Sequence, residues 1–419
     1  MHETAPITAF EASAIVICLA ALLGYLNHRL LKLPHVIGLT ILGAGLSLAA
    51  VAADFVIPGI GIGAWTTDFL SGLDFPETLL QGMLSFLLFA GALHVDLDEL
   101  KKGWLPILVL STVGVVISTV FVGFAFSLLT GMVGVDIPFI WCLVLGSIVS
   151  PTDPVSVLGI LKKATVPPTL QATVAGESLF NDGVGVVVFS ILLTAALSGA
   201  DFSLVAGLEL FAIEAGGGIL LGLVTGYIAF RAMRAIDVYS IEVLISLAVV
   251  MGGYALASRL HLAGPVAMAV AGLLIGNQGV SFAMSDITRD YLLKFWEIVD
   301  EVLNSVLFLL IGLEVIVIAA SGSYLVLAIV AIPLVLIARS LAVGIPMSGL
   351  RRLTPLSKMA TPILIWGGLR GGISIALALS LPDGPVRDAI LATTYGVVLF
   401  SVLVQGATVG KLVERLKSA

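Results

Sequence analysis

Long apolar stretches separated by short polar connections run along the whole chain. Most of them reach the ~20 residues that a helix needs to cross a bilayer, and none alternates polar with apolar residues as the strands of a membrane barrel do. The pattern predicts an all-α polytopic membrane protein with thirteen transmembrane helices, at about 7–27, 35–57, 76–95, 104–131, 137–161, 171–198, 203–231, 238–258, 262–277, 290–318, 323–347, 359–381 and 386–410.

Two of these spans contain residues that interrupt a helix. The fifth includes Pro151-Thr152-Asp153-Pro154, where two prolines remove backbone donors and disfavour helix in the residues just before them. The twelfth includes Arg370 among the four glycines of the stretch 367–372.

The interruptions fall at equivalent places if spans one to six and eight to thirteen are two halves joined by span seven. With six spans in each half and one between them, the second half enters from the opposite face of the membrane. Broken helices at corresponding positions of two halves are typical of a transporter's binding site. The pattern thus predicts two inverted six-helix repeats with discontinuous helices at spans 5 and 12.

Basic residues predict the orientation, because connections rich in Lys and Arg stay on the cytoplasmic side. Only Arg259 and Arg387 fall on one side of the predicted membrane, and Arg339 and Arg370 lie inside spans. The asymmetry places the N-terminus outside and the C-terminus in the cytoplasm, as an odd number of spans requires. The other sixteen of the twenty basic residues share the cytoplasmic side: Arg29, Lys32, Lys101, Lys102, Lys162, Lys163, Arg231, Arg234, Arg289, Lys294, Arg351, Arg352, Lys358, Lys411, Arg415 and Lys417.

Composition supports a membrane protein and excludes several classes of function. Of the 419 residues, 59% are hydrophobic and only 11% are charged, against roughly 25% charged residues in an average soluble domain. No basic patch supports binding of nucleic acid. Cys18 and Cys142 lie in apolar runs, without the spacing of a disulfide framework or of a cysteine metal site.

A polar cluster between residues 150 and 185 interrupts the apolar pattern. A charged side chain at bilayer depth costs at least ~2.5–3.5 kcal/mol, so it normally faces protein or a water-filled cavity. In the sixth span, Ser178 and Asp182 share one helix face, and Glu177 and Asn181 share a neighbouring one. The break in the fifth span leaves backbone groups free to meet an ion or a side chain.

The functional hypothesis for this cluster is a cation site of oxygen ligands. Its members are the Asp182 carboxylate, the Ser178 hydroxyl and an oxygen of Thr152 or Asp153. The alternative is that the acids are structural and pair with arginines to hold the helices together. We favour the ion-binding role for Asp182. For Asp153 both alternatives stay open, because a carboxylate at half-helix N-termini also stabilises their dipoles.

Glu177 fits the structural alternative. Its expected partner is Arg339, because an unpaired buried charge costs far more than a paired one. Arg370, among its glycines, is expected to stabilise half-helix C-termini electrostatically, and a contact with the substrate is the alternative. The candidate core then contains three carboxylates and two guanidinium groups. One negative charge remains, which one monovalent cation or one proton would neutralise.

Together these residues resemble a known family. The segment Gly176–Gly183 (GESLFNDG), with 150–154 before it and 338–340 and 367–371 after it, closely resembles the sodium/proton exchangers of the cation/proton antiporter-1 family. The resemblance implies that Asp182 carries the cation or proton, that Asn181 supports Asp153 across the helix crossing, and that Glu177 pairs with Arg339. The family's third span often carries a further acid, whereas this chain has Phe89-Ala90-Gly91-Ala92 there.

The resemblance also implies a homodimer whose protomers have two units. The dimerisation side would comprise residues 1–103 (spans 1–3) and 237–320 (spans 8–10). The ion-transporting core would comprise residues 104–199 (spans 4–6) and 321–419 (spans 11–13), with 200–236 (span 7) as a linker helix. The protein is then expected in the lipid of a bacterial-type inner or plasma membrane, with no cofactor and with transported Na⁺ and H⁺ as its small partners.

The expected activity is secondary active exchange of Na⁺ for H⁺, with Li⁺ and K⁺ as alternative cations. Both ions would compete for Asp182, and with Glu177 held by Arg339 the exchange is expected to be one for one and electroneutral. One alternative is a potassium-efflux antiporter or a cation channel. A second is an intramembrane enzyme, but neither G-x-S-x-G nor H-E-x-x-H occurs, and the five histidines lie away from the polar cluster. A transporter is therefore expected, and not an enzyme.

Overall fold

The computed structural model describes residues 8–56, 83–164, 166–198, 204–279, 284–314, 324–350, 357 and 359–418. Nearly all of them are helical, and in these ranges the isolated β-type pairing is a bridge between Asp153 and Leu369. Short π-helical turns continue several helices, namely η1 (Asn27–Leu31), η3 (Leu110–Gly114), η4 (Ile275–Gly279) and η6 (Ser401–Gln405). The α-helices are α1 (Ala9–Leu26), α2 (His35–Val56), α5 (Leu84–Leu93), α6 (Leu97–Lys102), α7 (Trp104–Val109), α8 (Val115–Val133), α9 (Phe139–Ile148), α10 (Val155–Lys163), α11 (Pro168–Ser198), α12 (Leu204–Met233), α13 (Tyr239–Arg259), α14 (Gly264–Leu274), α16 (Asp286–Leu313), α18 (Leu325–Leu350), α19 (Ala360–Trp366), α20 (Gly372–Leu379), α21 (Pro385–Phe400) and α22 (Gly406–Ser418).

Helices that can cross a bilayer dominate the described part of the chain. Eight are long and apolar enough: Phe10–Leu31, His35–Asp54, Trp104–Val133, Pro168–Ser198, Val205–Met233, Tyr239–Arg259, Leu325–Leu350 and Pro385–Lys417. Shorter apolar helices cover Leu84–Leu93, Phe139–Ile148 and Gly264–Asn277. The protein is therefore an integral, multi-pass helical membrane protein, as predicted.

Some sequence predictions fall on residues that the structure does not describe. Residues 76–82 of the predicted third span and 315–318 of the predicted tenth lie outside the described ranges, as do Arg351, Arg352 and Lys358 of the charge pattern. The count of thirteen spans stays a prediction.

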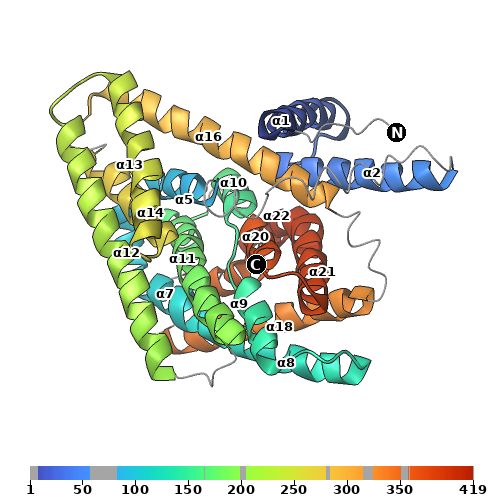
Figure 1. The fold of residues 1–419 in the computed structure, drawn as a ribbon. Helices are drawn as coiled ribbons and strands as arrows, with labels where there is room; N and C mark the ends of the chain where they lie inside the picture. Colours follow the sequence, from blue (N-terminus) through green and yellow to red (C-terminus); the bar gives the residue numbers. More distant parts are fainter. Residues whose placement is uncertain are drawn as a thin grey trace.

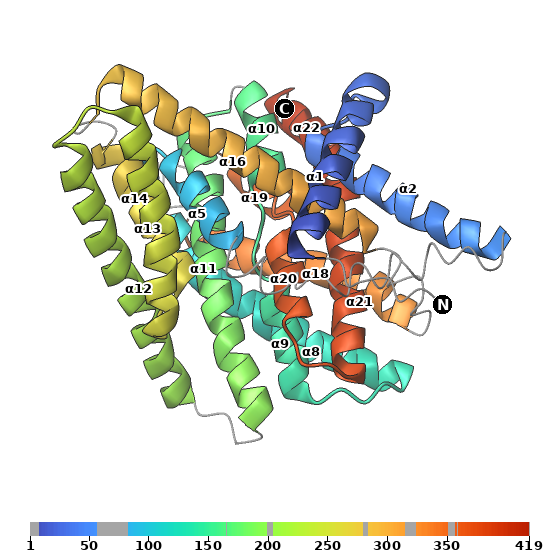
Figure 2. The ribbon, with the colours of Figure 1, turned by 45° about the horizontal axis from the view of Figure 1, so that its top comes forward.

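Two groups of helices lie on either side of α11. In both ribbon views α12, α13 and α14 stand together along one edge, while α8, α9, α18, α20 and α21 gather away from that edge (Figure 1, Figure 2). α11 packs against α9 on one side and against α12 and α14 on the other. α16 runs from α13 to α2 and contacts both (Figure 2). The helix that carries most of the polar cluster is thus enclosed by both groups.

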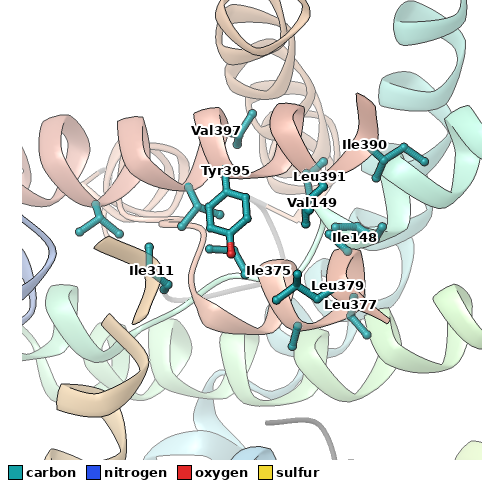
Figure 3. Close-up of a cluster of buried hydrophobic side chains, with 14 of the residues drawn as sticks. Ile148, Val149, Ile311, Ile375, Leu377, Leu379, Ile390, Leu391, Tyr395 and Val397 are labelled. Carbon is teal, nitrogen blue, oxygen red and sulfur yellow. The ribbon is translucent and has the colours of Figure 1, made fainter. Parts of the chain in front are cut away.

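One large cluster of buried apolar side chains joins α9, α16, α20 and α21. Helices in lipid gain little from the hydrophobic effect, so close van der Waals packing must hold such a cluster together. This packing fixes the end of α9 and the start of α20, which flank the two interrupted segments. Figure 3 shows Tyr395 among its neighbours, which include Ile148, Val149, Ile311, Ile375, Leu377, Leu379, Ile390, Leu391 and Val397.

Candidate ion site

The two interrupted segments meet inside the protein. α9 ends at Ile148 and α10 begins at Val155, while α19 ends at Trp366 and α20 begins at Gly372. Between these helix ends both segments leave the helical conformation, and the Asp153 N–H donates a hydrogen bond to the Leu369 carbonyl at 2.8 Å. Four half-helix ends therefore converge on one place, and each leaves backbone groups without intrahelical partners.

Glycines allow this close approach. A Cβ atom on Gly371 would lie 2.7 Å from the Cβ of Asp153, and one on Gly368 would lie 2.3 Å from the Nε of Arg339. Side chains at these two positions would collide with the opposite segment or with the arginine. The close contacts with Asp153 and Arg339 thus explain why Gly371 and Gly368 are glycines.

Asn181 of α11 holds the broken fifth span in place. Its Nδ2 donates to the Thr152 Oγ1 at 2.8 Å and to the Glu177 Oε1 at 2.9 Å, and its Oδ1 accepts from the Thr152 N–H at 3.2 Å. One helical turn earlier, Ser178 donates its hydroxyl to the Thr152 carbonyl. The hydroxyl oxygens of Thr152 and Ser178 lie 3.4 Å apart. These hydrogen bonds of Asn181 thus reach Thr152, the neighbour of Asp153.

Glu177 and Arg339 form a buried ion pair. The Nη1 and Nη2 atoms of Arg339 lie 2.8 and 3.0 Å from the two carboxylate oxygens of Glu177. Arg339 also donates from Nε and Nη2 to the Leu364 carbonyl, at 3.1 and 2.8 Å. Both side chains are almost fully buried, at 7% and 2% exposure. This two-point geometry is the strongest kind of Arg–carboxylate contact.

Arg370 binds the end of the other broken helix. Its Nη1 donates to the Ser150 and Pro151 carbonyls, the latter at 2.9 Å. These carbonyls follow the C-terminal end of α9, where the helix dipole is negative, so a cation is stabilising there.

Two residues that the sequence pattern did not single out support this arrangement. The Arg370 N–H donates to the Ser401 Oγ at 2.8 Å, and Ser401 in turn donates to the Gln405 Oε1 at 2.8 Å. Gln405 donates to the Trp366 carbonyl at 3.1 Å. The sequence contained a signal for these residues. A serine and a glutamine four residues apart in an apolar run place two polar groups on one helix face, which indicates polar partners inside the protein.

Asp182 differs from the other acids of the cluster. It is 5% exposed, and within the described ranges its Oδ1 has no hydrogen-bond partner. Its charged neighbours are Asp153, Glu177 and Arg370. A buried carboxylate oxygen without a donor is costly unless a cation or a proton completes it.

The oxygen atoms of this cluster are ligands of the kind that bind hard cations. The carboxylate of Asp182 and the hydroxyls of Ser178 and Thr152 are oxygen donors, the ligand class that hard cations prefer. Among the described residues, no group of three or more His, Cys, Asp or Glu side chains could hold a metal ion.

The stretch Phe89-Ala90-Gly91-Ala92 in the third predicted span supplies no acid. Phe89, Ala90 and Ala92 are buried, and Phe89 and Ala92 lie against Gly272 of α14.

Comparison with known proteins identifies the family. The model of the transmembrane sodium/hydrogen exchangers matches residues 17–415. The chain belongs to the sodium/hydrogen exchanger family. The predicted family resemblance is thereby confirmed, and the chain is placed among transporters and not among enzymes.

Several exchangers of this family are similar along most of their length. The Na⁺/H⁺ antiporter NhaP of Pseudomonas aeruginosa is 46% identical over 413 residues, covering 96% of each chain. The Na⁺/H⁺ antiporter NhaH of Halobacillus dabanensis is 36% identical over 346 residues, covering 82% of this chain and 84% of the relative. The structure of the sodium proton antiporter MjNhaP1 from Methanocaldococcus jannaschii matches with a TM-score of 0.75 at 21% identity, covering 97% of this chain and 98% of that one. The fold is thus that of a known antiporter.

Proposed function

We propose that this protein is a secondary active antiporter that exchanges Na⁺ for H⁺ across the membrane, with Asp182 as the group that binds either ion. Relatives that are 46% and 36% identical carry the name Na⁺/H⁺ antiporter. The observation that carries the assignment to Asp182 is its buried Oδ1, which has no hydrogen-bond partner in the described part of the chain, while nearby Glu177 is fully paired. Ser178 and Thr152 contribute oxygen ligands to Na⁺, and Asp153 and Asn181 support them at the crossing.

Competition at one carboxylate couples the two fluxes. Asp182 holds a proton or a cation but not both, and the core crosses between inward-open and outward-open states only when this charge is neutralised. The moving core comprises 104–199 and 321–419, and it moves against 1–103 and 237–320, which form the dimer contact. We expect thirteen spans in two inverted repeats, an arrangement in which transporters bind their ions near the middle of the membrane.

The exchange is one for one. With Glu177 neutralised by Arg339 at 2.8 Å, only Asp182 changes its bound ion during the cycle. No net charge then moves, because one Na⁺ replaces one H⁺. An exchange current that follows the membrane potential would contradict this stoichiometry.

The decisive experiment replaces the carboxylate of Asp182 by an amide. Asp182→Asn in proteoliposomes is expected to reduce sodium-driven proton movement to the background of empty vesicles, because the amide can neither take up a proton nor carry the charge that attracts Na⁺. Asp136→Asn makes the same chemical change at an exposed position, and it should keep the wild-type rate. Assays with Na⁺, Li⁺ and K⁺ give the cation preference. Full activity of Asp182→Asn would refute the assignment.

A further inference from the structure

A small cavity lies beside the Glu177–Arg339 ion pair. Its volume is about 10 Å³, which is about the space that one water molecule needs. A cavity of this size stays empty when its walls are apolar, but holds water when several polar groups line it. Here the polar walls come from Ser118, Ser150, Glu177, Asn181, Arg339 and Arg370.

Two groups on these walls have no hydrogen-bond partner among the described residues. One is the Oγ of Ser118 in α8, and the other is the Nη2 of Arg370. Both residues are buried, at 3% and 2% exposure. Buried polar groups without partners are costly, and in native proteins ordered water commonly satisfies them. Both residues line this cavity, so one ligand bound in it can serve both groups.

We propose that this cavity binds one ordered water molecule that links Ser118 to Arg370. The water oxygen accepts a hydrogen bond from the Nη2–H of Arg370, and one water hydrogen is donated to the Oγ of Ser118. The Ser150 hydroxyl and the Glu177 carboxylate on the same walls are acceptors for the second hydrogen. A bridging water of this kind is nearly as favourable as a direct hydrogen bond.

The water makes Ser118 a positioning residue for Arg370. The carbonyls of Ser150 and Pro151 hold one nitrogen of the guanidinium, and the water holds the other against α8. The charged groups around Arg370 are Glu177, Asp182 and Arg339. The orientation of the guanidinium therefore affects the electrostatic potential at Asp182, a step that rests on the proposed function.

Cryo-electron microscopy of the full chain in lipid nanodiscs tests the water itself. At a resolution that shows ordered water, wild-type protein should have one density peak within hydrogen-bond distance of the Arg370 Nη2 and the Ser118 Oγ. Ser118→Val, whose methyl groups fill the cavity, should lack it. An empty cavity in the wild type would overturn the proposal. This readout is independent of transport, so it separates failure of the water site from failure of the proposed function.

The kinetics of exchange test the positioning role. Ser118→Ala is expected to change the KM for Na⁺ by about threefold, which corresponds to roughly 0.7 kcal/mol, while the maximal rate is retained, because a displaced guanidinium alters the potential at the ion site. Ser111→Ala is the matched control and should keep the wild-type KM, since this buried serine donates to the Leu108 carbonyl at 3.3 Å and does not line the cavity. A lower maximal rate of Ser118→Ala with an unchanged KM would refute the role.

Discussion

At the scale of single residues, the pairing of Glu177 with Arg339 separates the roles proposed for the acids of the cluster. Glu177 shares a two-point ion pair and receives a further bond from Asn181. Asp182, five residues later on the same helix, has a carboxylate oxygen with no donor among the described residues. The two carboxylates therefore differ in their partners, and the roles proposed for them follow from that difference.

Removing either partner of the ion pair should destabilise the protein strongly. Glu177→Gln and Arg339→Gln each leave one buried charge without its counter-charge, which costs about 3–5 kcal/mol. The double variant removes both charges, and it should be more stable than the sum of the two single losses predicts, by about 0.5–3 kcal/mol. Thermal unfolding of the purified protein in detergent measures all four members of this cycle. Additive losses would show that the two side chains do not interact in solution.

Residue chemistry is readable from the sequence only in part. The helical period by itself places Ser178 with Asp182 and Glu177 with Asn181. Charge pairing also predicts Glu177 as the partner of Arg339, but no sequence pattern indicates which backbone carbonyl Arg339 contacts. The Leu364 carbonyl, which accepts two of its hydrogen bonds, could therefore not be predicted. The spacing of Ser401 and Gln405 marks a polar helix face, but it does not indicate that Ser401 accepts a hydrogen bond from the Arg370 N–H.

At the scale of elements, the glycines of the twelfth predicted span determine how closely the two broken helices approach. Gly371 has φ of −126°, which any residue can adopt, so its importance lies in contact and not in backbone conformation. The 2.7 Å separation from the Asp153 Cβ leaves no room for a methyl group. The prolines and glycines of the sequence therefore predict the two interruptions, but only the three-dimensional structure shows that the interrupted segments contact each other.

Gly371→Ala should force the two crossing segments apart. Overpacking of this kind costs about 1–3 kcal/mol, and displacement of Asp153 should slow exchange as well. Gly344→Ala in α18 is the matched control, because no atom of a described residue lies within 4 Å of the added methyl group and alanine favours helix by up to about 1 kcal/mol. Thermal unfolding and sodium-driven exchange are measured for both variants. Equal behaviour of the two would show that the crossing tolerates expansion.

At the scale of the whole molecule, hydropathy predicts the membrane class far better than it predicts where helices end. The predicted span 137–161 contains α9, an extended segment and α10, and neither helix has more than ten residues. The predicted start of the tenth span at 290 lies inside α16, whose first residue is Asp286. Polar caps and amphipathic first turns extend helices beyond their apolar part, so hydropathy alone misplaces such boundaries.

The orientation of the chain can be tested with single cysteines at its exposed connections. In a background of Cys18→Ala and Cys142→Ala, Asp136→Cys follows the fourth predicted span and Glu414→Cys follows the last; both positions are exposed. Nine predicted spans separate the two positions, and an odd number between them puts them on opposite faces of the membrane, with Glu414 in the cytoplasm. A membrane-impermeant thiol reagent should label Asp136→Cys in intact cells, and Glu414→Cys only after the cells are permeabilised. Labelling of both from outside would contradict the proposed orientation, because the basic residues near the C-terminus would then lie on the face where such residues are rare.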